Sequence, residues 1–197
     1  YSPIVRADCT ALMRSGDDIW IACRYKGIYR VDRHTRRVVK HYTKTSAGSP
    51  LPSNNIRYVY ADSKGRLWIT TEFDGFYCLE LATGKLKRYD ERQGLLDQNI
   101  TSISEDEEGN LWMGSYNGLY RYSPRSGGFV KQDVDQAVSE YTFGGSCFDG
   151  RRMYFSTTKG LVSFVPRQIS IPPLCTEVAF LSLSLISSDH TVFDLFT

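Results

Sequence analysis

Short apolar runs separated by turn-forming residues recur along most of this chain, and one stretch shows the pattern most clearly. Residues 56–90 contain runs rich in β-branched and aromatic side chains, divided by the polar segments Asp62–Arg66 and Glu72–Asp74 and by the Thr83-Gly84 turn. Each run is about five to seven residues long, a usual strand length, and its composition favours β-structure. The stretch therefore predicts a meander of antiparallel strands. Such a sheet cannot bury both of its faces alone, so it requires similar neighbours.

These neighbours are visible as further copies of the pattern. In each copy an aromatic anchor is followed six or seven residues later by a glycine and another apolar run. The anchors, separated by 48, 44 and 42 residues, are Trp20, Trp68, Trp112 and Tyr154, and the glycines are Gly27, Gly75, Gly118 and Gly160. A period of roughly 40–50 residues with four strands in each unit is typical of a β-propeller. We therefore predict an all-β chain of about four four-stranded antiparallel sheets, arranged as blades of a partial ring.

The repeat sets the expected domain boundaries. Blades are expected near residues 3–43, 55–90, 99–131 and 141–166, so that propeller repeats occupy residues 1–168. The fourth unit lacks a clear outer strand after Pro166. Residues 169–197 are expected to form a linker and the first strands of a following β domain, because Val178–Ile186 alternates apolar and polar residues and Thr191–Phe196 begins another strand. Alternatively, Ile169–Ile186 supplies the outer strand of the fourth unit.

Composition narrows the classes of function. The 197 residues are 41% hydrophobic and 13% aromatic, and the formal net charge is +2. A charge this small gives no support to binding of nucleic acid or of an acidic membrane. The chain has no apolar run of about eighteen residues, and its start carries no charged-then-apolar leader. We therefore expect this segment to meet a membrane only through other parts of a longer protein.

The cysteines lack the Cys-x-x-Cys spacing of a metal or redox motif. They are Cys9, Cys23, Cys78, Cys147 and Cys175. Most fall in predicted strands, where a thiol packs as a small apolar group, so we expect buried free thiols. The alternative is one disulfide, for which Cys9 and Cys23 are the best pair because they fall in adjacent predicted strands.

One unit carries a motif specific enough to suggest a family. Residues 99–122 run from Asn99-Ile100 through Asp106-x-x-Gly109 and Leu-Trp to the predicted strand Gly118–Tyr122. This segment resembles the two-component regulator propeller repeat, and residues 55–79 fit nearly as well. The first unit lacks the Asp-x-x-Gly spacing, and the fourth has a tyrosine in place of the tryptophan. The resemblance covers residues 4–166, with two strong repeats and two weak ones.

The resemblance implies a function that composition alone does not reach. Repeats of this family form the periplasmic ligand-sensing part of hybrid two-component histidine kinases in Bacteroidetes-type bacteria. These are inner-membrane proteins that control transcription, many of them in response to oligosaccharides. The resemblance implies that this chain is a non-catalytic fragment of such a sensor, that its tail opens an immunoglobulin-like domain, and that the intact sensor self-associates as a dimer. Alternatives are a scaffold for protein–protein interaction and a propeller lyase.

The residue types that carry chemistry in other proteins favour structural roles here. The three tryptophans share one repeat position, so we expect them to pack between sheets rather than to stack on sugars. The segments Asp62-x-x-Gly65 and Asp106-x-x-Gly109 predict hairpin turns closed by the Asp side chain. A calcium loop is the alternative, but its Asp-x-Asp-x-Asp spacing is absent.

Histidines and arginines give no further site. His34, His41 and His190 have no partner at the spacing of a metal site, so no metal, cofactor or catalytic residue is predicted. A basic cluster at an outer hairpin is expected to be solvated surface. It consists of Arg33, Arg36 and Arg37.

The loops between the second and third strands differ from unit to unit, whereas their flanks repeat. In a propeller these loops and the fourth-to-first connections gather on one face around the central channel, and variable loops on a repeated frame are common recognition sites. Their aromatic, charged and amide side chains suit an oligosaccharide or another small polar ligand. The candidate ligand-binding residues are Arg24, Tyr25, Lys26, Glu72, Phe73, Asp74, Tyr116, Asn117 and Lys159.

Overall fold

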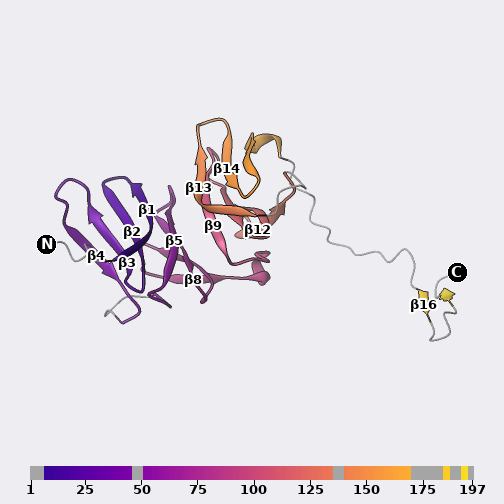
Figure 1. Cartoon of the computed structure of the whole chain (residues 1–197), viewed down its shortest axis with the longest axis horizontal. Helices are drawn as coiled ribbons and strands as arrows, with labels where there is room; N and C mark the ends of the chain where they lie inside the picture. Colours follow the sequence, from indigo (N-terminus) through magenta and orange to yellow (C-terminus); the bar gives the residue numbers. More distant parts are fainter. Residues whose placement is uncertain (1–6, 46–50, 135–139, 170–183, 187–191, 195–197) are drawn as a thin grey trace.

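The computed structural model describes residues 7–45, 51–134, 140–169, 184–186 and 192–194. Nearly all regular structure in these ranges is β. Four antiparallel sheets of three or four strands follow one another along the chain, and a two-stranded sheet lies near its C-terminal end (Figure 1). The all-β propeller expected from the repeat is confirmed. No helix among the described residues is long and apolar enough to cross a membrane.

Each sheet is a meander in which consecutive strands are neighbours. The first sheet contains β1 (Asp8–Ser15), β2 (Asp18–Arg24), β3 (Gly27–Asp32) and β4 (Val38–Tyr42). The second contains β5 (Ile56–Ala61), β6 (Arg66–Thr71), β7 (Phe76–Glu80) and β8 (Leu86–Tyr89). The third contains β9 (Ile100–Glu105), β10 (Leu111–Ser115), β11 (Gly118–Ser123) and β12 (Gly128–Gln132). The fourth has three strands in the described part of the chain, β13 (Tyr141–Phe148), β14 (Met153–Thr157) and β15 (Gly160–Phe164).

The tail was expected to begin a second β domain. Most of the expected strands Val178–Ile186 and Thr191–Phe196 lie outside the described residues. Within them, β16 (Ser184–Ile186) pairs with β17 (Val192–Asp194), not with β15. The alternative in which this segment is the outer strand of the fourth sheet is therefore wrong for residues 184–186. The following β domain stays a prediction.

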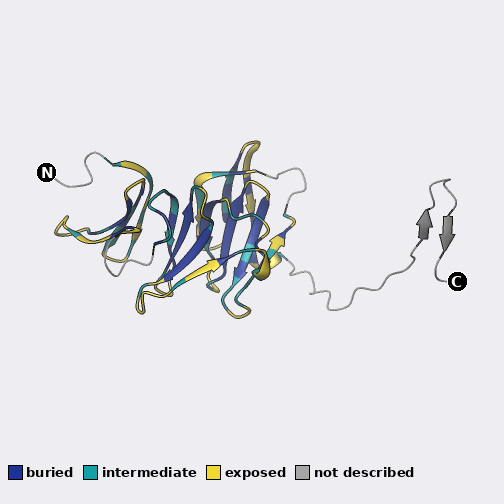
Figure 2. Ribbon diagram, turned by 90° about the horizontal axis from the view of Figure 1, so that it is seen from below, coloured by how far each residue is buried: buried dark blue, intermediate teal, exposed yellow. Residues whose placement is uncertain are grey.

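The sheets pack through their first strands. β1 lies against β5, β5 against β9, and β9 against β13, whereas β4, β8 and β12 are the strands furthest from these contacts in their sheets. Side-chain hydrogen bonds join neighbouring sheets here, such as Thr10 Oγ1 to the Ile56 carbonyl at 2.7 Å and Ser146 Oγ to the Ile103 carbonyl at 3.0 Å. The main clusters of buried residues each include residues of two neighbouring sheets, and Figure 2 shows buried segments on the strands of these sheets.

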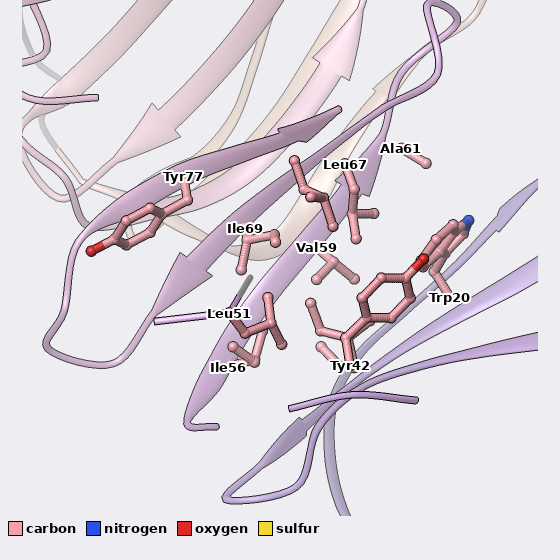
Figure 3. Packing of buried hydrophobic residues seen from close by; sticks show 12 residues of the cluster. Trp20, Tyr42, Leu51, Ile56, Val59, Ala61, Leu67, Ile69 and Tyr77 are labelled. Carbon is pink, nitrogen blue, oxygen red and sulfur yellow. The ribbon is translucent and has the colours of Figure 1, made fainter. Parts of the chain in front are cut away.

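Each tryptophan points from its own sheet into the next one. Trp20 belongs to a cluster with Ile56, Val59 and Ile69 of the second sheet, and Figure 3 shows its indole on the side of this interface opposite Val59. Trp68 packs with third-sheet residues and Trp112 with fourth-sheet residues. The indoles are at most 1% exposed, so the prediction that they pack between sheets is confirmed.

The Asp-x-x-Gly segments form the predicted turns and also hold the tryptophans. Asp106 Oδ1 accepts hydrogen bonds from the backbone N–H groups of Glu108 and Asn110 at 3.0 and 2.9 Å. Its other oxygen, Oδ2, accepts the indole N–H of Trp112 at 2.9 Å. Asp62 makes the same bonds to its own turn and to Trp68. The turn interpretation is confirmed, and the link to the indole is a second role that the spacing did not reveal.

The expectation of buried thiols holds for only part of the set. Cys23 and Cys78 are buried free thiols, but Cys9 and Cys147 are exposed, so the prediction is wrong for these two. Cys9 lies near the start of β1, and Cys147 lies beside Tyr154 on the face of the fourth sheet that points away from the third. Cys175 lies outside the described residues.

The basic cluster at the outer hairpin behaves as expected. Arg33, Arg36 and Arg37 are exposed, and Arg33 Nε pairs with Asp17 Oδ1 at 3.0 Å at the surface. A surface ion pair of this kind contributes little to stability.

Candidate functional site

The loops between second and third strands lie beside the connections that lead into first strands, as the sequence predicted. The Glu72 N–H donates to the Asn55 carbonyl at 3.0 Å. The Asn117 N–H donates to Asp97 Oδ2 at 3.1 Å. The Thr158 N–H donates to the Glu140 carbonyl at 3.3 Å. These loops and the connections therefore share one face of the propeller.

A depression of about 250 Å³ opens where the first strands of three sheets approach one another. It is lined by Asp8, Cys9, Thr10, Arg24, Arg57 and Phe143. These residues come from β1, β2, β5 and β13, so the first, second and fourth sheets all contribute to it. We call this the central depression.

Opposite charges are paired around the central depression. Arg57 Nε lies 3.1 Å from Glu72 Oε2, and these side chains are only 25% and 20% exposed. Arg24 Nη1 donates to Asp8 Oδ2 at 3.1 Å, in a pair that is more open to solvent. The four groups sum to zero charge and present both donors and acceptors. This arrangement suits a neutral polar ligand better than a highly charged one.

Aromatic rings add an apolar wall to the same site. The guanidinium of Arg57 lies 4.4 Å from the ring centroid of Phe143, within the range of a cation–π contact. Tyr116 meets Phe143 edge to face, with ring centroids 5.9 Å apart. The two aromatic residues remain 42–43% exposed, so both keep surface available to a ligand.

A break in the β13 strand coincides with the exposed position of Phe143. Tyr141 pairs with Thr157 of β14, and the next pair is Ser146 with Phe155, so residues 142–145 bulge out of register. The bulge contains Gly144 and Gly145, and a larger residue would fit poorly at either position. Gly144 has a φ of +68°, and a Cβ on Gly145 would overlap the side chain of Ser156. Bulges often re-aim a side chain beside a functional site.

The structure brings together only some of the predicted site residues. Arg24 lines the central depression, Glu72 pairs with Arg57, and Tyr116 contacts Phe143. Phe73, which is 88% exposed, lines a separate depression of about 180 Å³ with Arg88 and Gln98.

The remaining candidates do not line the central depression. Tyr25 and Lys26 form the exposed tip of the β2–β3 hairpin. Backbone N–H groups of Asp74, Asn117 and Lys159 donate to side-chain hydroxyls within the same loops.

Among the residues that line the central depression, the sequence predicted only Arg24. It missed Asp8, Cys9, Thr10, Arg57 and Phe143. Asp8, Cys9 and Arg57 sit near the starts of first strands, outside the second-to-third-strand loops from which the candidates were taken. A signal for Phe143 existed in the sequence, because the two glycines of Phe143-Gly144-Gly145 at the start of the fourth predicted blade indicate a bulge. Their convergence depends on how the sheets are placed around one another.

A third depression, of about 270 Å³, lies among the turns between other strands. Lys64, Asn110 and Arg121 contribute to it. Asn110 is bonded to Asp106, and Arg121 lies over the Trp112 ring at 5.5 Å. These polar groups already support the turns and the tryptophan, so we favour the central depression.

The histidines and other potential metal ligands were also placed by the structure. No group of three or more His, Cys, Asp and Glu side chains in the described ranges is placed to hold a metal ion. The His41 ring stacks on Tyr29 at 3.9 Å, and its Nε2 lies 2.7 Å from the Lys26 carbonyl, outside the central depression. His190 lies outside the described residues.

Comparisons with known proteins agree with this architecture. Residues 50–73 and 94–117 match the family described as "Two component regulator propeller". The chain is 32% identical over 206 aligned residues to histidine kinase P4 of Formosa agariphila, an alignment that covers 78% of this chain and 15% of that kinase. The chain thus spans a small part of the length of this curated relative.

Solved structures with the same fold include two extracellular domains from B. thetaiotaomicron. The domain of the hybrid two component system BT3049 matches with a TM-score of 0.67 and 22% identity, over 84% of this chain and 22% of that chain. The domain of the hybrid two component system BT4673 matches with a TM-score of 0.63 and 17% identity, over 83% and 22% of the two chains. At these identities the likeness shows the fold. The chain is therefore a β-propeller in which residues 50–73 and 94–117 match the two-component regulator propeller repeat.

Proposed function

We propose that this chain is a non-catalytic, ligand-recognising part of the periplasmic propeller of a hybrid two-component sensor histidine kinase in the inner membrane. The repeats and the sequence similarity to a histidine kinase support the sensor assignment. The similarity in fold to extracellular domains supports a position outside the cytoplasm.

The proposed ligand is an oligosaccharide bound at the central depression. The observation that carries this proposal is the combination of Arg57, Glu72 and the exposed ring of Phe143 at one site. A sugar offers many hydroxyl groups to the ion pair and an apolar ring face to the aromatic side chain. The volume of the central depression is smaller than that of a typical site for a drug-sized ligand, which is about 300–1,000 Å³. The depression would therefore hold one end of the oligosaccharide, with the rest running over the loop face toward Phe73.

Binding would act on signalling by favouring one of two arrangements of the sensor. A ligand in the central depression would contact strands of the first, second and fourth sheets at once. It would stabilise the arrangement of the sheets in which all three can contact it. We propose that this bias passes to the kinase and controls transcription. We also propose that the intact sensor self-associates as a dimer, which light scattering of the intact ectodomain would test.

Calorimetry on the intact ectodomain with a panel of oligosaccharides tests the ligand proposal. Phe143→Ala and Arg57→Ala should each weaken binding by about tenfold or more, because each removes a hot-spot contact. Tyr116→Ala should have a smaller effect, and Phe73→Ala should weaken binding only of longer oligosaccharides. Leu161→Ala is a matched control, because Leu161 is 68% exposed on the fourth sheet and does not line the depression. Wild-type affinity in both Phe143→Ala and Arg57→Ala would contradict the proposed site.

A further inference from the structure

Cys9 and Cys23 face each other directly across the first strand pair. They are register partners in the antiparallel pair of β1 and β2, and their Sγ atoms are 3.5 Å apart. Directly opposed residues of antiparallel strands have Cα atoms about 4.5–5.5 Å apart. This separation lies within the range of about 4.4–6.8 Å found in disulfides. The two sulfur atoms therefore need only small side-chain rotations to bond.

The two thiols differ in access to solvent. Cys9 is exposed, whereas Cys23 is completely buried. Burial, with a smaller contribution from the hydrogen bond to Cys9, raises the pKa of the Cys23 thiol to about 12. A thiolate is the attacking species in disulfide exchange. An external reagent therefore meets Cys9 first, and Cys23 can react only with a sulfur atom that Cys9 brings to it.

We propose that Cys9 and Cys23 form an intramolecular disulfide by exchange with a small-molecule or protein disulfide. The Cys9 thiolate attacks one sulfur of the oxidant, whose S–S bond breaks and releases one thiolate. Cys23 then loses its proton and attacks Cys9 Sγ in the mixed disulfide, which releases the second thiol of the oxidant. Two protein thiols are oxidised to one disulfide, and one oxidant disulfide is reduced to two thiols.

This bond would fix one wall of the central depression. Cys9 lines the depression, and the neighbouring register pair is Asp8 with Arg24, which also line it. On the other side of Cys9, the register slips before Ala11, and Thr10 Oγ1 bonds to the second sheet. The cross-link would therefore hold the irregular end of β1 against β2. The inference does not depend on the ligand proposed above.

The test is a thiol count on the purified chain with and without oxidised glutathione. After incubation, the wild type should lose two alkylatable thiols and the mass of two hydrogen atoms. Peptide mapping should place the bond between Cys9 and Cys23. The Tm should rise by roughly 5–10 °C, because the bond closes a loop of about 15 residues in the unfolded chain. Reduction should reverse each change.

Two single variants make the result specific. Cys9→Ser, at an exposed position, should lose the oxidation and the rise in Tm, whereas Cys147→Ser should keep both. A stable glutathione adduct on Cys9, a bond to another cysteine, or unchanged thiols after oxidation would each overturn the inference. Peptide mapping of the wild type alone decides the question if a variant folds poorly.

Discussion

The indole N–H of Trp112 donates a hydrogen bond to Oδ2 of Asp106 at 2.9 Å, and both residues are almost completely buried. One carboxylate thus closes a hairpin turn and fixes the side chain that fills the interface with the next sheet. The same relationship joins Asp62 and Trp68 at 2.8 Å. Turn geometry and packing between sheets are therefore coupled through a single buried group.

This coupling predicts that Asp106→Asn destabilises the chain by about 2–3 kcal/mol. An amide has one accepting oxygen in place of two, and its NH₂ group would face donors. Urea unfolding followed by fluorescence would measure the change. Asp149→Asn is the matched control, because Asp149 accepts bonds from a similar turn but is exposed. Equal losses in the two variants would contradict the role assigned to the buried indole bond.

Close packing between the third and fourth sheets predicts a large effect of Gly114→Ala. A Cβ at Gly114 would lie 2.6 Å from Tyr141 Cβ and 2.8 Å from Ser102 Oγ, which are both held in strands. Overpacking of this kind costs about 1–3 kcal/mol. Gly128→Ala, where the nearest atom would be 3.5 Å away, should cost clearly less. Thermal unfolding of the two variants would distinguish them, and similar Tm values would count against the packing argument.

Burial of the indoles predicts the emission wavelength of the tryptophans and their quenching by acrylamide. Trp20, Trp68 and Trp112 are at most 1% exposed, so the native protein should emit at short wavelength and resist quenching by acrylamide. Urea should shift the emission to longer wavelength and remove the protection. Ligand binding at the central depression should leave the quenching unchanged, because no indole lines it. Quenching in the native state as strong as in urea would contradict packing between sheets.

Thiol reactivity should divide the cysteines by burial. Burial raises the pKa of Cys78 from its ordinary value of 9.0 to about 12, so at pH 8 native Cys78 should resist iodoacetamide, while exposed Cys147 reacts. The folded state binds the Cys78 proton more tightly than the unfolded state. The associated stability is present below pH 9 and is lost as the pH rises from 9 to about 12. Mass mapping of alkylated peptides checks the first expectation, and unfolding at a series of pH values checks the second.

The sequence predicted the fold from positions that repeat. The tryptophan at one place in successive units indicated the interface between sheets, because identical positions of stacked sheets face the same layer. The repeat pattern predicted the central depression less well than it predicted the fold. Arg57 and Phe143 become neighbours only through the placement of the second and fourth sheets and the bulge at Gly144-Gly145. The sequence predicted that Cys9 is buried, but Cys9 is exposed at the central depression. A position in a strand does not reveal whether the side chain faces a neighbouring sheet or such a depression.

The direction in which the tryptophans point has a consequence for folding. Each of the first three sheets is completed by the one that follows it, so the free energy of the propeller comes mainly from nearest-neighbour couplings, as in a linear array of repeats. A lesion at Trp68 would act on the interface of the second and third sheets and would divide the array into two halves that melt separately. A ligand that joins Arg24 to Phe143 would link the first half to the second and make that melting more cooperative.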